Sequence, residues 1–370
     1  MKNIKYLIIA LAVLMVLWLL PAFVQLLAPD ATRPPFVLYS FLDNDFICME
    51  SQNGVQHFHD FKGNKFTKHE ADSLLPLFAF RQLLAEGRLP DTIGGIAVTP
   101  KLIQQNAFHF KTSPKQLNRP SIGLYTMFES QSGNVDLVLP PDVFRLTHNG
   151  LEFIDCKTNE ILKAKSISFS RELEKHGFTF PVNLIWGNGS PRKDYDNGFL
   201  LTDQNNRLFQ LKMVKGAPFV REIQLNDQIG NVQIIKVFTL EPANRALIGL
   251  FVTADHRLFA VRSNATVAHI GASNDPINDN IVNEKILKYD PDSMPVTIVG
   301  DLKHWTITLY TATDSRYYAV DANTFELVAS HIVPDPAPQG WNKLKKFLLP
   351  LRLSFTSWHD QYIFPHLNDD

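Results

Sequence analysis

The sequence has little cysteine, almost no net charge and few long hydrophobic runs, and each shortage excludes a class of protein. Only Cys48 and Cys156 occur among 370 residues, and neither belongs to a C-x-x-C pair, so a zinc ribbon and a thioredoxin-like site are unsupported. Outside the cytoplasm the two thiols could form a disulfide, but two separate, buried small residues are the commoner arrangement. Lys and Arg number 36 against 37 Asp and Glu. Nucleic-acid-binding proteins usually carry a basic excess or stripe, so we expect no nucleic-acid partner.

Catalytic signatures are also missing from the sequence. It holds no P-loop, no G-x-S-x-G elbow, no H-E-x-x-H motif and no complete EF-hand loop. His57 and His59 would share one face of a strand, but no third ligand accompanies them, and a polar outer face explains them equally well. We therefore predict no catalytic residue, no metal site and no cofactor, and we lean against an enzyme. Three acidic clusters suit either calcium or ordinary turns: 43–45, 278–280 and 290–292.

One long hydrophobic run does occur, near the N-terminus. From Tyr6 to Ala28, with Trp18 inside the run, no residue is charged, and about 20 apolar residues suffice for a membrane-spanning helix. A cleaved signal peptide is the alternative, but its apolar region is about 7–15 residues long and a small-x-small site follows it. We predict a retained transmembrane anchor over 1–28 and a Pro-rich linker over 29–35.

The charges beside this run predict which side of the membrane the chain occupies. Lys2 and Lys5 precede the run, and the positive-inside rule keeps such residues in the cytoplasm. We therefore expect an inner-membrane protein with a cytoplasmic N-terminus and a periplasmic main domain at 36–370.

The main domain repeats a short strand pattern. Each copy has a run of β-forming residues, and the clearer copies continue with a polar turn and another strand. In two copies the turn reads Asp-x-x-Thr-x-Glu, beginning at Asp155 and Asp321, where Asp suits a turn because its side chain bonds the nearby backbone. In three copies a preceding strand ends at an Asp and leads to an Arg within a few residues. The five copies are 54–66, 150–162, 207–212, 257–262 and 316–328.

The spacing of the copies predicts the fold class. A four-stranded propeller blade takes roughly 40–50 residues, and three of the four intervals fit this length with room for loops. The longest interval contains a partly helical insertion at about 67–120. We expect a mainly β chain, with one transmembrane helix and then a β-propeller-like domain of about five blades, in which 353–364 joins 36–41 in one blade. The alternative is an open or sandwiched antiparallel sheet built from the same hairpins.

A Gly-containing loop at 186–198 is the most distinctive polar segment. Trp, Arg and Tyr occur in it together, and these residue types are enriched at interaction hot spots. The alternative is a solvated loop whose charges pair locally. The residues that we expect to bind a partner are Trp186, Arg192, Lys193, Asp194, Tyr195 and Asp196.

With the repeats, the stretches 77–83, 98–104 and 192–198 resemble a family of bacterial, single-span envelope proteins classed as a domain of unknown function. The resemblance runs over most of the chain. Members of this family look like neighbours of ABC-transporter permease components, which implies an accessory role. The family has no assigned catalytic residues, so the resemblance implies none here.

These observations favour a membrane-anchored, extracytoplasmic binding or assembly protein. Its partners would be the membrane, through the single span, and a transporter or other envelope protein. The alternative is a propeller-type hydrolase acting on an envelope glycan or peptide, which requires converging carboxylates that the sequence does not single out. Signalling across the membrane is disfavoured, because only five residues precede Tyr6.

Overall fold

The structure is a computed structural model that divides the chain into two compact units. We call Phe36–Pro334 the main unit, and Met1–Pro35 together with Asp335–Asp370 the terminal unit. The structure describes residues 2–27, 35–52, 54–131, 133, 137–225, 229–230, 232–272, 287–334, 351–355 and 363–367.

The terminal unit contains one helix and one pair of strands. Helix α1 spans Lys2–Leu27, and Tyr6 lies in it with an exposed side chain. The side chain of Trp18 and the whole of Ala28 lie outside the described residues. In the part of the chain that the structure describes, no helix combines the length and the apolar character that a membrane crossing requires. The anchor expected over 1–28 therefore stays a prediction.

The C-terminal strands contradict one expectation. The sequence predicts that 353–364 joins 36–41 in one blade, but β23 (Leu351–Phe355) pairs with β24 (Ile363–Leu367) in a sheet of its own. The segment at 36–41 forms β1 (Phe36–Ser40), which belongs to a four-stranded sheet built entirely from the N-terminal part of the main unit. The physical reason is local closure, since two strands joined by a short connection lose less chain entropy than strands from opposite ends of the chain.

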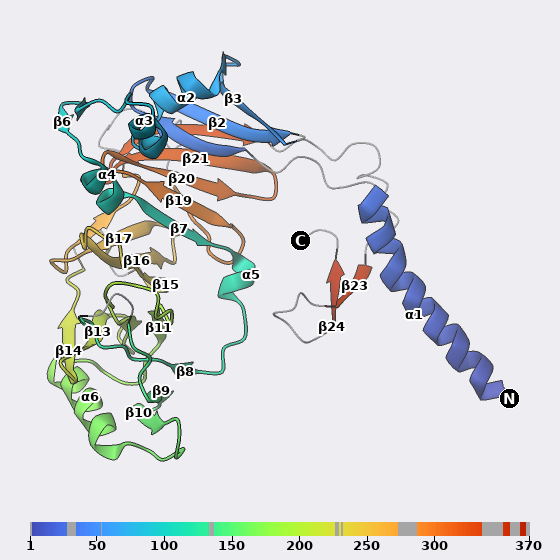
Figure 1. Cartoon of the computed structure of the whole chain (residues 1–370). Coiled ribbons are helices and arrows are strands. Elements are labelled where there is room, and N and C mark those ends of the chain that lie inside the picture. Colours follow the sequence, from blue (N-terminus) through green and yellow to red (C-terminus); the bar gives the residue numbers. More distant parts are fainter. Residues whose placement is uncertain are drawn as a thin grey trace. The chain divides into compact units, whose positions relative to one another are not determined.

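The main unit is mainly β and contains five antiparallel sheets of three to five strands (Figure 1). Sheet 1 consists of β1, β2 (Asp45–Gln52), β3 (Val55–Asp60) and β4 (Lys65–Phe66), and sheet 2 of β8 (Leu124–Tyr125), β9 (Asp142–Thr147) and β10 (Gly150–Asp155). Sheet 3 consists of β11 (Leu184–Gly187), β12 (Phe199–Thr202), β13 (Leu208–Val214) and β14 (Ala217–Glu222). Sheet 4 consists of β15 (Ile234–Thr239), β16 (Leu247–Thr253), β17 (Leu258–Arg262) and β18 (Val267–His269). Sheet 5 consists of β7 (Phe108–Thr112), β19 (Val296–Gly300), β20 (His304–Tyr310), β21 (Asp314–Asp321) and β22 (Leu327–Pro334).

The repeats found in the sequence correspond to equivalent strands. Each of the five copies supplies the third strand of a different chain-ordered meander, namely β3, β10, β13, β17 and β21. The predicted repeat of antiparallel hairpins is therefore confirmed. Among the described strands no sheet closes on itself. A ring of blades stays a prediction.

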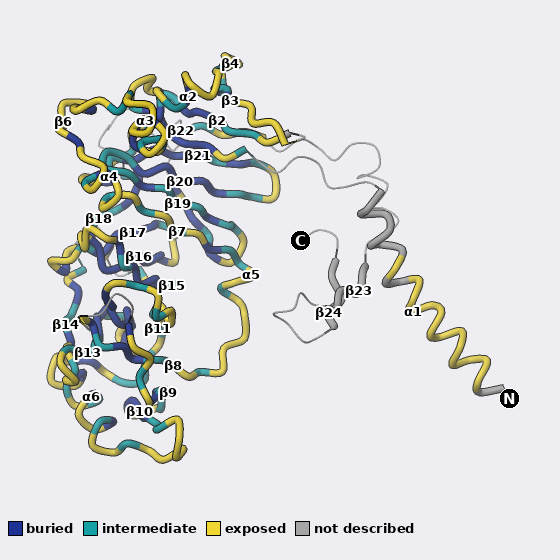
Figure 2. Tube along the Cα trace, viewed as in Figure 1, coloured by how far each residue is buried: buried dark blue, intermediate teal, exposed yellow. Residues whose placement is uncertain are grey.

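Neighbouring sheets bury their apolar faces against each other. Phe238 of sheet 4 and Ile307 of sheet 5 belong to one buried cluster, and Leu200 of sheet 3 and Phe251 of sheet 4 to another. Sheet 1 packs on sheet 5, where the backbone N–H of Tyr39 donates to Thr306 Oγ1 at 2.9 Å. Figure 2 shows this arrangement as dark buried strands within the sheets and exposed loops between them.

The insertion between sheets 1 and 2 carries short helices and strand β7. The helices are α2 (Lys68–Leu74), α3 (Phe80–Ala85), α4 (Pro100–Asn106) and α5 (Pro114–Leu117), and a small hairpin joins β5 (Thr92–Ile93) to β6 (Ile96–Ala97). Thr67 and Glu70 form a capping box that starts α2. After α4 the chain straightens into β7, which pairs antiparallel with β19, Phe110 facing Ile298. One further helix, α6 (Lys163–Lys175), follows β10.

Candidate functional site

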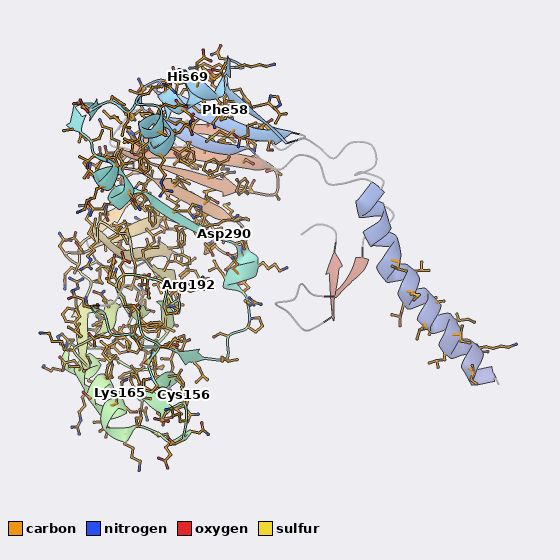
Figure 3. All side chains as sticks on the ribbon, in the orientation of Figure 1. Phe58, His69, Cys156, Lys165, Arg192 and Asp290 are labelled. Atoms are coloured by element: carbon orange, nitrogen blue, oxygen red, sulfur yellow. The ribbon has the colours of Figure 1, made fainter. Side chains whose placement is uncertain are left out.

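Some side chains of the loop at 186–198 are exposed and others are buried. Trp186 at the end of β11 is 36% exposed, and Arg192 and Asp194 are also exposed; Arg192 is labelled in Figure 3. Tyr195 and Asp196 are buried instead. The loop therefore presents three of its six predicted binding residues to solvent.

Lys193 is the centre of a buried ionic cluster. Its ammonium contacts Asp196 Oδ1 and lies 3.0 Å from Glu241 Oε1, and the three side chains are only 7%, 2% and 6% exposed. Lys193 Nζ also donates to the carbonyl of Asn188 at 2.7 Å and lies 5.1 Å from the centre of the Phe128 ring. Removing charges from water is costly unless they are paired, so this cluster ties the loop to the segment after β15.

Asp196 is the least satisfied member of the cluster. Its Oδ2 has no hydrogen-bond partner among the described residues. Burial opposes the charged form more strongly than Lys193 favours it, and the pKa of Asp196 is raised to about 6. The carboxyl therefore changes charge within the range of pH that a protein tolerates without unfolding.

Further hydrogen bonds fix the loop to the same segment and to the start of β16. The Tyr195 hydroxyl donates to the carbonyl of Pro242 at 2.7 Å, and burial raises the pKa of Tyr195. Asn197 Nδ2 donates to the carbonyls of Leu240 at 2.6 Å and Leu247 at 3.2 Å. Each buried donor thus has an acceptor, which holds the loop in one conformation.

A cleft of about 620 Å³ lies beside this loop. Its walls are formed by three separate stretches of the chain, 107–111, 186–189 and 239–243. Trp186 stands in one wall, its ring 5.4 Å from that of Phe238 and nearly perpendicular to it. Glu241 stands in another, held by Lys193 and by Asn188 Nδ2 at 3.0 Å. The volume is in the range of small-molecule and peptide sites.

Strand β7 forms the third wall of the cleft. His109 and Lys111 are exposed, whereas Phe108 and Phe110 turn into the core, where Phe110 packs 5.2 Å from Phe238. Glu241 is paired with Lys193, whereas Lys111 has no ion pair within the described part of the chain.

A second hollow lies on the sheet 1 side of β7. It measures about 350 Å³ and is lined mainly by apolar residues of sheet 1, the α2–α3 connection, β7 and β19. Phe36 and Phe78 lie at its rim, 39% and 51% exposed, with ring centres 5.8 Å apart. The two hollows share residues 107–109, so β7 separates an apolar hollow from a polar cleft.

The remaining predicted sites have plain structural surroundings. Both cysteines are free: Cys48 is buried in β2, which raises its pKa to about 12, and Cys156, labelled in Figure 3, is exposed. His59 Nε2 lies 3.4 Å from Glu50 Oε1, and His57 is exposed on the same strand. Among the described residues, no three His, Cys, Asp or Glu side chains gather as a metal site would require. The acidic cluster at 278–280 lies outside them.

The sequence analysis identified only one of the three walls of the cleft, the one at 186–189, and missed those at 107–111 and 239–243. Nothing in the local pattern distinguishes Glu241 as the partner of Lys193. The sequence analysis assigned 108–111 to a partly helical insertion, and the alternation of Phe with His and Lys there is the signal that could have revealed a half-buried strand. The binding role of all these residues stays a prediction.

The family model of a domain of unknown function (DUF4857) matches residues 36–320. The chain belongs to the DUF4857 family. No curated protein matches this DUF4857 chain. One similar solved structure is described as the Dos1 propeller, at 11% identity and a TM-score of 0.29, covering 82% of this chain and 62% of that one. Another is the dihydro-heme d1 dehydrogenase NirN in complex with DHE, at 10% identity and a TM-score of 0.27, covering 82% and 69%. The DUF4857 chain thus spans less than two thirds of the Dos1 structure, and likeness at these scores carries no argument about function.

Proposed function

We propose that this DUF4857 protein is a membrane-anchored, extracytoplasmic binding and assembly protein, an accessory component of a transporter or another envelope complex. Its partner docks in the cleft between β7, the loop at 186–198 and the segment at 239–243. The observation that carries the proposal is a tryptophan, Trp186, that is 36% exposed in the wall of a rigid, polar cleft. Trp is, with Tyr and Arg, one of the residue types that are enriched at binding hot spots.

The wall of the cleft is rigid before any partner arrives. Thr239 Oγ1 donates to the carbonyl of Trp186 at 2.7 Å and accepts from the N–H of Leu200 at 3.1 Å, so it joins β15 to both β11 and β12. Together with the cluster on Lys193, this fixes the backbone beneath Trp186. A preorganised surface loses little conformational entropy on binding, which favours a recognition role.

The alternative function, hydrolysis of an envelope glycan or peptide, has less support. It requires two carboxyl groups that face a common substrate. Glu241, which lines the cleft, and Asp196 behind Lys193 both pair with the Lys193 ammonium. Asp196 is only 2% exposed and Glu241 only 6%, so the two carboxyl groups do not face a common substrate across the cleft.

The proposed membrane location rests on α1 and on Lys2 and Lys5 in its first turns. The helix is continuous over Lys2–Leu27, and its described apolar side chains at 6–9 and 13–16 are exposed. A helix that is apolar on all sides needs an apolar environment. This reasoning supports a lipid-embedded α1 with the main unit outside the cytoplasm.

The proposal is tested by affinity purification of the full chain from detergent-solubilised membranes, with mass spectrometry of the proteins that co-purify. Wild type is compared with Trp186→Ala and with Phe219→Ala as a matched control, since Trp186 and Phe219 are 36% and 39% exposed. We expect an envelope or transporter protein to co-purify with wild type and with Phe219→Ala. With Trp186→Ala the amount of this partner should fall at least tenfold, while the melting temperature of the chain is unchanged. Purification of the chain alone, or equal recovery with all three, overturns the proposal.

A further inference from the structure

The cleft runs along the edge of β7 rather than across its face. Successive side chains of a strand point to opposite faces of the sheet, so a cavity on one face touches alternate residues. This cleft touches every residue from 107 to 111. A cavity in contact with both faces and the backbone between them lies along the strand's edge.

That edge carries backbone groups without a strand partner. Sheet 5 has the order β22-β21-β20-β19-β7, so among the described strands β7 is terminal and pairs on one side only. In an antiparallel ladder, alternate residues direct their N–H and C=O groups to the same side. Alternate residues of β7 therefore present a donor and an acceptor to the cleft.

The size of the cleft suits an added strand. A strand extends by about 3.3 Å per residue and lies about 4.8 Å from its neighbour, so the run at 107–111 faces a strand of similar length. The opposite walls at 186–189 and 239–243 would cover the outer side of such a strand. An extended peptide bound in this way gains main-chain hydrogen bonds from the edge and specificity from side-chain pockets.

The charge of the cleft selects among peptides. Lys111 and His109 both project from β7 to solvent, and Lys111 has no acidic partner among the described residues. Glu241 is occupied by Lys193. An acidic side chain on the incoming strand would pair with Lys111, and a neighbouring apolar side chain would pack on Trp186.

We infer that the occupant of the cleft is an extended protein segment with an acidic side chain, which adds to sheet 5 as a strand beside β7. This inference rests on the proposed binding function and names its partner's chemistry. It is the backbone of β7, more than any side chain, that makes the contact.

The first test is a random heptapeptide library displayed on phage and panned against the full chain in detergent micelles, with Lys111→Glu for counter-selection. The best peptide is synthesised with one backbone N-methyl group at each position in turn, and binding is followed by fluorescence anisotropy. We expect enrichment of peptides with Asp or Glu, and at least tenfold weaker binding when alternate positions are methylated. No enrichment, or a peptide whose affinity no N-methyl group changes, overturns the inference.

A second test uses β7 itself. In His109→Pro and Phe110→Pro the missing N–H falls on opposite sides of the strand, and Pro is tolerated only where that N–H faces away from a partner strand. We expect the variant that lacks the N–H facing β19 to lose pairing and to have a lower melting temperature. The other variant should keep the wild-type melting temperature and bind the selected peptide at least tenfold more weakly. Normal peptide binding by the variant that melts normally contradicts strand addition.

These tests are independent of the purification experiment. If an envelope partner co-purifies but N-methylated peptides bind normally, the function stands and the strand-addition inference fails. If peptides add to β7 as expected but no envelope protein co-purifies, the inference stands and the proposed function fails.

Discussion

Asp196 and Lys193 show how a charge pattern in a loop acquires a structural role. Charged and aromatic residues in a Gly-containing loop look like a solvated binding surface. Here the carboxylate of Glu241, from a distant segment, gives Lys193 a second partner. The ion pair offsets part of the desolvation cost of burying the ammonium. The sequence shows the residue types, but the burial follows from a contact that only the packing of sheets 3 and 4 creates.

The raised pKa of Asp196 predicts a pH dependence of stability. The folded pKa is about 6 and the ordinary value is 3.8, so between these values the folded state binds more protons than the unfolded state. The contribution of Asp196 is fully present below about pH 4 and is lost as the pH rises through 6, on the order of 2 to 3 kcal/mol at 1.36 kcal/mol per pKa unit.

Urea unfolding of wild type and Asp196→Asn from pH 4 to 7.5 measures this effect. The free energy of unfolding of wild type minus that of the variant should fall with rising pH. A difference that rises with pH would mean that the ion pair with Lys193 outweighs burial.

Two glycines of the same loop provide a matched pair. Gly198 has φ +69°, and an added Cβ would meet the carbonyl oxygen of Leu211 at 2.1 Å, whereas nothing lies within 4 Å of a Cβ at Gly189. Gly198→Ala should lower the free energy of unfolding by more than about 2 kcal/mol, because it combines strain with overpacking. Gly189→Ala should change it by less than about 0.5 kcal/mol. Equal effects in urea unfolding would show that the loop lacks the described conformation.

At the scale of elements, the hairpin between the second and third strands recurs with its own ion pair. Arg207 Nη2 lies 2.6 Å from Asp203 Oδ2, and Arg257 Nε lies 2.6 Å from Asp255 Oδ2. The two Asp side chains differ in surroundings, since they are 0% and 43% exposed. The same Asp–Arg pattern therefore contributes differently to the stability of different sheets.

This difference predicts unequal costs of substitution. Asp203 Oδ1 accepts from the N–H groups of Asn205 and Arg207, both at 2.9 Å, and the carboxylate is fully buried. Asp203→Ala should cost about 3 kcal/mol or more, because buried donors lose a charged acceptor. Asp255→Ala should cost under about 1 kcal/mol, as for other exposed pairs. Thermal and urea unfolding of both variants measure these costs. A larger loss of unfolding free energy in Asp255→Ala than in Asp203→Ala would contradict the prediction.

The hairpins were predictable from sequence, whereas β7 and its cleft were not. Alternating apolar residues and an Asp-containing turn are local signals, so 207–212 and 316–328 were recognisable as strands with the correct position in each repeat. The role of β7 depends on β19, which pairs Phe110 with Ile298 across a long stretch of chain. No local pattern specifies such pairing, so Glu241, His109 and Lys111 could not be placed beside Trp186 in advance.

At the scale of the whole molecule, the proposal links a lipid-embedded α1 to a main unit outside the cytoplasm. A reporter that is active only in the periplasm, fused after Asp370, should be active in cells. The same fusion with Lys2 and Lys5 changed to Glu should lose orientation and activity, because cytoplasmic Lys residues fix the direction of insertion. Activity of a cytoplasm-specific reporter at the same position would contradict the export of the main unit.

The cleft beside β7 is the feature on which the account depends, and in-cell photo-cross-linking tests it most directly. Benzoylphenylalanine replaces His109 in the cleft or, as a matched control, His57 on β3 of sheet 1; both histidines are exposed on strands. The account predicts a covalent adduct with an envelope protein from position 109, none from position 57, and loss of the adduct in Trp186→Ala. No adduct at 109, or the same adduct from both positions, would contradict it.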